Sequence, residues 1–232
     1  MGRKKTITAR WRWPAAILLL LLIGFGAVWW HFIHWTPSRQ SFPLQGIAIG
    51  AADGPVNLRA YKVIGANLVY IEASRGAEAR DARFGDNLAQ ARAAHLQVGA
   101  VHIYDPCLPA ERQAANFVTT VPRDEDLLPP VVSLDALADD CASYVSPEAV
   151  ESELTTFVNQ IEGHAGKAAI LRVSKRFQKR YMIASRLSRD LWLERDWFQP
   201  DYAGRPWTLW TANGSLRTEA SLNPVHWLVV QP

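Results

Sequence analysis

The sequence has 232 residues, of which 49% are hydrophobic and 20% are charged, and its formal net charge is +3. This composition excludes a disordered tail and a nucleic-acid-binding protein rich in basic residues. The positive charge comes from the amino terminus, because five of the 25 Lys and Arg residues precede an apolar run. The other 20 nearly balance the 22 acidic residues, so no polyanion-binding surface is expected.

An apolar run occupies residues 14–35 and begins with the uncharged stretch PAAILLLLLIGFGAVWW. About 20 helical residues cross the hydrocarbon core of a bilayer, so the run predicts one transmembrane helix. The basic residues before it predict a cytoplasmic tail at residues 1–13 and export of the rest. The alternative is a cleaved signal peptide. Its cleavage site needs small residues, but Trp29, Trp30 and Phe32 stand there, so we expect an uncleaved signal anchor.

The two cysteines, Cys107 and Cys141, lie in the part of the chain that we expect to be exported. In an oxidising compartment a disulfide between them is expected, and two free buried thiols are the alternative. The disulfide would close a loop of about 35 residues and contribute roughly 3–4 kcal/mol to stability. An uncleaved anchor with one small exported domain suits a bacterial inner membrane, with the carboxyl-terminal domain in the periplasm. The cysteines and scattered histidines lack metal-ligand spacing, so neither a metal nor a cofactor is predicted.

Residues 36–44 are polar, contain two prolines and are expected to form a linker. After them, short apolar runs alternate with amphipathic stretches. The runs are typical of strands covered on both faces, and they are 46–50, 67–73, 97–103, 130–135, 168–173, 191–193 and 207–210. Helical patterns cover 84–95, 109–121 and 146–164. Repeated strand–helix units predict a parallel sheet, either open or closed into a barrel.

Several segments occur in the order and spacing of motifs in a known family. They are GIAIG at 46–50, IEASRG at 71–76, Asp81 with Phe84 and Asn87, GAVHI at 99–103, QAANF at 113–117, LPP at 128–130, LWL at 191–193 and PWTLW at 206–210. Together they resemble glycoside hydrolase family 25, the lysozyme or muramidase family. The resemblance implies an irregular TIM-like (β/α) barrel over residues 45–232, and peptidoglycan or a related glycan as its partner.

The acidic residues of that family are mostly replaced in this chain. The family's catalytic Asp-x-Glu corresponds to Ser133-Leu134-Asp135, its first-strand Asp to Ala48, and its acidic residue near the carboxyl end to Ser221. Because residues two apart on a strand face the same side, Ser133 and Asp135 should point together into the barrel mouth. Three family carboxylates are thus missing, and the fourth is shortened to Asp135.

Hydrolysis of a glycosidic bond takes a proton donor and a second carboxylate. Asp135 is the surviving candidate for one catalytic role. Glu72, where the family has Lys, and Glu194 are the acids that can replace the lost partner, and we take Glu72 as the second catalytic candidate. The alternative for Glu72 is a salt bridge with Arg75.

Four further residues are candidates for substrate binding. His102 matches a histidine of the family and can instead be structural. Tyr104, Trp192 and Trp210 can stack on sugar rings, and core packing is the alternative for them. The basic run at 175–180 reads as a solvated helix face, with attraction to anionic wall polymers or to the membrane surface as the alternative.

The sequence thus predicts a lysozyme-like, membrane-anchored cell-wall protein whose catalysis is weak or lost. The alternative is a non-catalytic peptidoglycan-binding or scaffold protein on the lysozyme fold. No nucleic-acid partner is expected, and the oligomeric state is left open.

Overall fold

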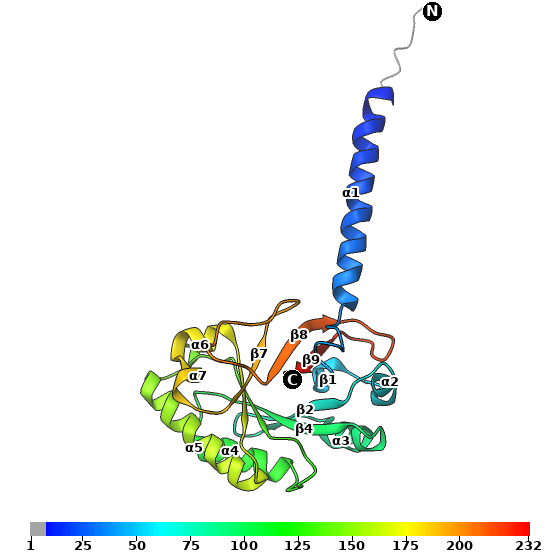
Figure 1. Cartoon of the computed structure of the whole chain (residues 1–232). Helices are drawn as coiled ribbons and strands as arrows, with labels where there is room; N and C mark the ends of the chain where they lie inside the picture. The colour runs from blue at the N-terminus through cyan, green and yellow to red at the C-terminus, as the bar shows by residue number, and fades with distance from the viewer. Residues whose placement is uncertain (1–7) are drawn as a thin grey trace, which may run out of the picture. The chain divides into compact units, whose positions relative to one another are not determined.

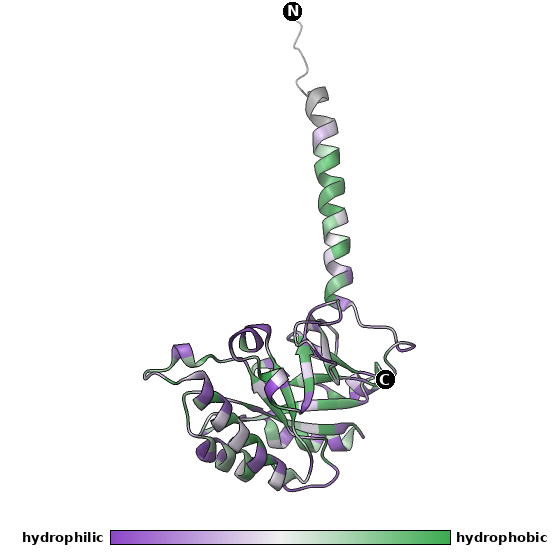
Figure 2. Ribbon diagram, turned by 60° about the vertical axis from the view of Figure 1, so that its left-hand side comes forward, coloured by the Kyte–Doolittle hydropathy of each residue, from purple (hydrophilic) through white to green (hydrophobic). Residues whose placement is uncertain are grey.

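The amino-terminal part of the chain is one long helix. The computed structural model describes residues 8–232, which divide into two compact units at the boundary between Trp35 and Thr36. In the first unit, α1 (Thr8–His34) contains the segment Trp13–His34, whose mean hydropathy of 2.2 and length suffice to cross a membrane. Hydrophobic residues occupy most of its length (Figure 2), and most of their side chains are exposed. Such a helix is compatible with a membrane anchor. Residues 1–7 of the predicted basic tail lie outside the described residues.

The second unit is a closed barrel with mixed strand directions (Figure 1). Among the described residues, eight strands close the barrel in the order β1–β2–β4–β5–β6–β7–β8–β9 and back to β1. The seven barrel strands from β1 to β8, β3 excepted, run parallel around it, whereas β9 is antiparallel to both β8 and β1. The strands are β1 (Gln45–Ile49), β2 (Leu68–Arg75), β4 (Gln97–Ile103), β5 (Val131–Leu134), β6 (Ile170–Val173), β7 (Asp190–Glu194), β8 (Leu209–Leu216) and β9 (Val225–Val230). A short strand, β3 (Ala79–Arg80), forms a hairpin with the end of β2.

Helices lie on the outside of the barrel, in the connections between its strands (Figure 1). They are α2 (Leu58–Val63), α3 (Phe84–Ala93), α4 (Ala110–Thr120), α5 (Pro147–Ala165), α6 (Lys175–Tyr181) and α7 (Ile183–Arg186), with short 3₁₀ helices η1 (Ala51–Asp53) and η2 (Ala138–Asp140). The closed barrel expected from the sequence is confirmed. The regular alternation of strand and helix of a TIM barrel is not confirmed, because β7, β8 and β9 follow one another without a helix in the described chain.

The interior of the barrel is filled by side chains from its strands. Inward-facing members of one core cluster are Ala48, Leu68, Tyr70, Val101, Val131, Ile170, Trp192, Leu209 and Leu228. All are at most 5% exposed. Burying a large apolar side chain contributes about 1.5–3 kcal/mol, so this cluster holds the strands together.

Residues 36–44, which the sequence predicts to be a linker, pack on the barrel. The Gln45 side chain donates hydrogen bonds to the carbonyl oxygens of Pro37 (3.0 Å) and Phe42 (2.9 Å). The ring of Phe42 is buried against Trp207 and Trp210. The second unit therefore begins at Thr36, and its chain enters at the amino-terminal end of β1.

The expected disulfide between Cys107 and Cys141 is confirmed. It joins the loop after β4 to the segment after η2, so it fastens together two loops that follow neighbouring strands. Its loop of 34 residues is long enough for a substantial entropic contribution.

Replacing both cysteines by serine is expected to lower the free energy of unfolding by roughly 3–4 kcal/mol, because the unfolded chain loses its cross-link. Urea denaturation of the detergent-solubilised protein measures this difference. Reduced wild-type protein is the matched control and should resemble the double variant. Equal stability of oxidised wild type and the variant would contradict the assignment.

Candidate functional site

A polar cavity of about 150 Å³ opens at the end of the barrel where β1, β2, β4 and β6 finish. Because β9 runs antiparallel, the beginning of β9 lies at this same end. The polar side chains that line the cavity come from four separate segments: Asp53, Tyr70, Glu72, Arg172 and His226. The carboxyl ends of barrel strands are where sites are built in strand–helix barrels, so this cavity is the candidate site.

Glu72 is the catalytic candidate that the structure brings to the cavity. Its Oε1 accepts a hydrogen bond from Arg75 Nη2 at 3.0 Å, as the salt-bridge interpretation expected. Its Oε2 lies beside Gly50, where an added Cβ would approach that oxygen and Glu72 Cβ to 3.1 Å. The glycine at the end of β1 therefore leaves room for the carboxylate.

Asp53 is a second carboxylate at the cavity, and the sequence interpretation missed it. It lies in η1, directly after β1, and its Oδ2 accepts a hydrogen bond from the Gly50 N–H at 2.7 Å. That bond folds the chain back at the end of β1 and holds the carboxylate at the mouth. An acidic residue four positions beyond a strand end was the available signal.

Arg172 brings a positive charge into the barrel mouth. It interrupts the apolar strand β6, and its side chain is only 16% exposed. The guanidinium carbon lies 4.8 Å from the centre of the Trp192 ring, and Nε donates to Glu194 Oε1 at 2.8 Å. A partly buried guanidinium needs such compensation, because an unpaired buried charge is costly. Glu194, the third candidate acid, is thus engaged in an ion pair.

His226, on β9, is also a lining residue that the sequence interpretation missed. Its Nδ1 is buried without a hydrogen-bond partner among residues 8–232. Burial lowers the pKa of His226, and the charge of Arg172 lowers it further, against the opposing influence of Glu194, Asp53 and Asp196. The imidazole is therefore uncharged at neutral pH.

Asp135 follows β5 but is not among the residues that line the cavity. Arg176, in the first turn of α6, binds it through two hydrogen bonds, with Nε to Oδ1 at 2.7 Å. Burial raises the pKa of Asp135, but hydrogen bonds from Arg176 and Ser174 and the charges of Arg176 and Arg172 outweigh it, so the pKa is lowered. The side chain is 54% exposed. Asp135 is therefore held as an anion, which is the wrong state for a proton donor.

The three positions at which family carboxylates are replaced lie in different surroundings. Ala48 lines the cavity, and Ser133 is buried and pairs with Arg172 in the β5–β6 register. Ser221 lies away from the cavity lining, where its hydroxyl bonds to Tyr61 Oη and to the Asn223 carbonyl, both at 2.8 Å. None of these side chains can transfer a proton as a carboxylic acid does.

The residues predicted to bind sugar are packed inside the domain. His102 is fully buried and bonds to Ser74 Oγ (2.8 Å) and Gln113 Oε1 (3.3 Å). Tyr104 is 1% exposed and packs on Phe157. These placements favour the structural interpretation for both residues.

The two tryptophans are buried as well. Trp192 is fully buried below Arg172 and donates from Nε1 to Thr211 Oγ1 at 2.7 Å. Trp210 is 2% exposed and donates from Nε1 to the Arg195 carbonyl at 2.8 Å. Trp192 acts on the cavity through Arg172, and neither ring offers an open face for stacking.

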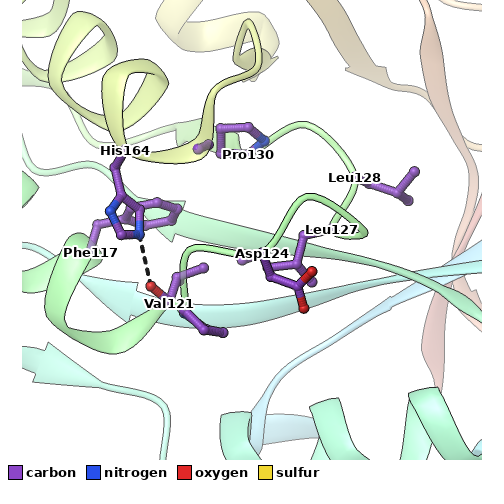
Figure 3. A pocket seen from close by; sticks show the side chains of 10 residues that line it. Phe117, Val121, Asp124, Leu127, Leu128, Pro130 and His164 are labelled. Carbon is purple, nitrogen blue, oxygen red and sulfur yellow. Dashed lines mark hydrogen bonds between the residues drawn. The ribbon is translucent and has the colours of Figure 1, made fainter.

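A second cavity lies where α4 and α5 end, near the start of β5 (Figure 3). Its volume is about 10 Å³, enough for at most one water molecule. His164 bonds through Nε2 to the Val121 carbonyl at 2.9 Å, which ties the ends of the two helices together. This cavity is a packing gap, so we do not treat it as a ligand site. Within the described chain, no cluster of three or more His, Cys, Asp or Glu side chains could hold a metal ion.

The sequence and the structure are both similar to those of known proteins. A sequence model of Glycosyl hydrolases family 25 matches residues 47–216. The structure is similar to a family 25 glycosyl hydrolase from Bacillus anthracis, with 24% identity, a TM-score of 0.78, and coverage of 87% of this chain and 94% of that one. It is also similar to a bacterial lysozyme from Streptomyces coelicolor, with 19% identity, a TM-score of 0.72, and coverage of 82% and 92%. A GH25 lysozyme from Aspergillus fumigatus is similar too, with 19% identity, a TM-score of 0.68, and coverage of 82% of this chain and 94% of that one. No curated protein matches the sequence.

The buried state of His102 leads to a pH-dependent stability. The pKa of His102 is lowered to about 4, mainly because the imidazole is buried. The hydrogen bond to Gln113 raises this pKa, and the charge of Arg75 lowers it further. An unfolded histidine titrates near 6.5. Between about pH 6.5 and 4 only the unfolded chain binds this proton. The free energy of unfolding should therefore fall by about 3 kcal/mol as the pH is lowered through that range.

Thermal unfolding between pH 7 and pH 4.5 measures the loss, and NMR titration of the imidazole identifies the group. A His102→Asn variant should be less stable at pH 7 and should lose less stability on acidification. An imidazole of His102 that titrates near 6.5 would refute this account.

Proposed function

Because this chain belongs to glycosyl hydrolase family 25, we propose that it is a membrane-anchored cell-wall protein that binds peptidoglycan and cleaves it weakly or not at all. Residues 14–35 form the membrane span in this proposal, and the barrel works in the periplasm. Support for export comes from the disulfide, since such bonds persist in oxidising compartments. The chain enters the barrel at the start of β1, whereas the cavity lies at the end of the barrel where β1 finishes.

The observation that carries the proposal is the state of Asp135. A glycosidase acid must be protonated near the operating pH and must reach the bond that breaks. Asp135 is an ion-paired anion outside the cavity lining, and its pKa is lowered. Its neighbour Ser133 supplies no second carboxylate. A misplaced or missing acid costs on the order of 10²-fold or more in rate.

A second candidate function has one observation in its favour. Glu72 and Asp53 both line the cavity, so they form a pair of carboxylates at the mouth of the barrel. In this alternative, Glu72 donates the proton and Asp53 stabilises the positive charge that develops on the sugar. The ion pair of Glu72 with Arg75 opposes it, because the oxygen Oε1 of the proposed proton donor is already bound to a guanidinium.

Incubating the purified protein with isolated peptidoglycan separates these functions. We expect the protein to sediment with the polymer and to release reducing ends at least about 10²-fold more slowly than an active lysozyme, since the proton donor is missing. Asp135→Asn should change neither result. Asp139→Asn, which alters a neighbouring exposed ion pair with Arg180, is the matched control.

Two outcomes would contradict the proposal. Rapid release of reducing ends that Asp135→Asn abolishes would restore Asp135 as the catalytic acid. Activity lost in Glu72→Gln but kept in Asp135→Asn would favour the second candidate function.

A further inference from the structure

The cavity at the barrel mouth carries opposite charges on opposite walls. Around the closed barrel, β6 is four strands away from β1, so it stands on the far side. Arg172 therefore faces the wall formed by Asp53, which follows β1, and by Glu72 on the adjacent β2. The other side chains that line the cavity are uncharged. They include His226, which can titrate but whose lowered pKa leaves its imidazole neutral at pH 7.

Each wall keeps hydrogen-bonding capacity that the protein does not use. Arg172 binds Glu194 through Nε and Nη2, and Nη1 makes no hydrogen bond within the described residues. Glu72 binds Arg75 through Oε1, and Asp53 binds the Gly50 N–H through Oδ2. The other oxygens, Glu72 Oε2 and Asp53 Oδ1, are without a hydrogen bond in the part of the chain that the structure describes. One wall can still donate, and the other can still accept.

The size of the cavity limits what can enter. Sites for drug-sized ligands span about 300–1,000 Å³, whereas this cavity measures about 150 Å³. It therefore fits one small polar group rather than a run of sugar rings.

The charges on the two walls further restrict which ligands can bind. A simple anion attracted to Arg172 would be repelled by the two carboxylates, and a simple cation attracted to the carboxylates would be repelled by Arg172. A ligand that carries both charges complements both walls. Charge-assisted hydrogen bonds are also the strong ones, and a guanidinium can hold a carboxylate through two parallel bonds.

We propose that the cavity binds an amino acid group whose α-carboxylate and α-ammonium are both free, with the carboxylate on Arg172 and the ammonium group between Glu72 and Asp53. Within a peptide, both groups stay free on one residue only in the side chain of a diamino dicarboxylic acid, a type of residue that the peptides of peptidoglycan can contain. The inference therefore rests on the proposed function, and it assigns recognition at this cavity to the peptide rather than to the glycan.

NMR titration of the full-length protein in detergent micelles tests this assignment with four probes: D-alanine, N-acetyl-D-alanine, D-alaninamide and N-acetylglucosamine. D-Alanine should bind. Removing either charge should weaken binding at least about tenfold, since each charge makes its own hydrogen bonds. Tighter binding of N-acetylglucosamine than of D-alanine would overturn the inference and assign the cavity to a sugar.

Variants test which side chain of the cavity binds each charged group of D-alanine. Glu72→Gln should reduce the preference for D-alanine over N-acetyl-D-alanine, because Asp53 alone then binds the ammonium group. Arg172→Gln should abolish the preference for D-alanine over D-alaninamide. Arg172→Lys keeps the charge and should retain part of that preference, which guards against a variant that fails to fold. Asp139→Asn should leave every affinity unchanged. Preferences that neither Glu72→Gln nor Arg172→Gln changes would overturn the assignment.

The result also separates this inference from the function on which it rests. A protein that sediments with peptidoglycan but binds no D-alanine would refute the amino acid site alone. A protein that binds D-alanine with the expected preferences but does not sediment with peptidoglycan would refute the cell-wall function and leave the site intact.

Discussion

The site depends on the closure of the barrel by β9. This strand pairs antiparallel with β8 on one side and with β1 on the other. Without those two ladders the parallel strands would form an open sheet with two unpaired edges, which proteins must protect. Closure turns the sheet into a ring, so that β6 stands across from β1. It also places His226, at the start of β9, beside the ends of the parallel strands.

Within that ring, the chemistry follows from how charges are paired. Arg172 sits on the buried Trp192 ring and binds Glu194, while Arg176 binds Asp135 outside the cavity. The mouth is thus organised around ion pairs rather than around a proton donor and its partner carboxylate. Such pairs favour charged groups, which suits recognition of a charged ligand and does not suit acid catalysis. Weak catalysis and ligand binding therefore have the same physical origin in this account.

Much of the fold could be predicted from the sequence, because its buried strands are continuous apolar runs and several helices have clear start signals. Ser146, for example, caps α5 as expected. The strand β9 was not predicted at all, and an apolar run such as 225–230 would not have shown that the strand is antiparallel. The site was predicted only in part. Glu72 reaches the cavity, but Arg172 and His226 are 54 residues apart in the sequence, and only closure brings them together. The partner of Asp135 is likewise 41 residues away.

Arg176 holds Asp135 as an anion, and the ionisation of this carboxyl group can be observed directly. Carbon NMR of the Asp135 carboxyl group, recorded as a function of pH, measures the pKa in the folded protein. The account predicts a pKa below the usual range of an aspartate in the wild type and a higher pKa in Arg176→Gln, which removes the main hydrogen bonds. A wild-type Asp135 that titrates well above the usual range, toward neutral pH, would make it a competent proton donor and would contradict the account.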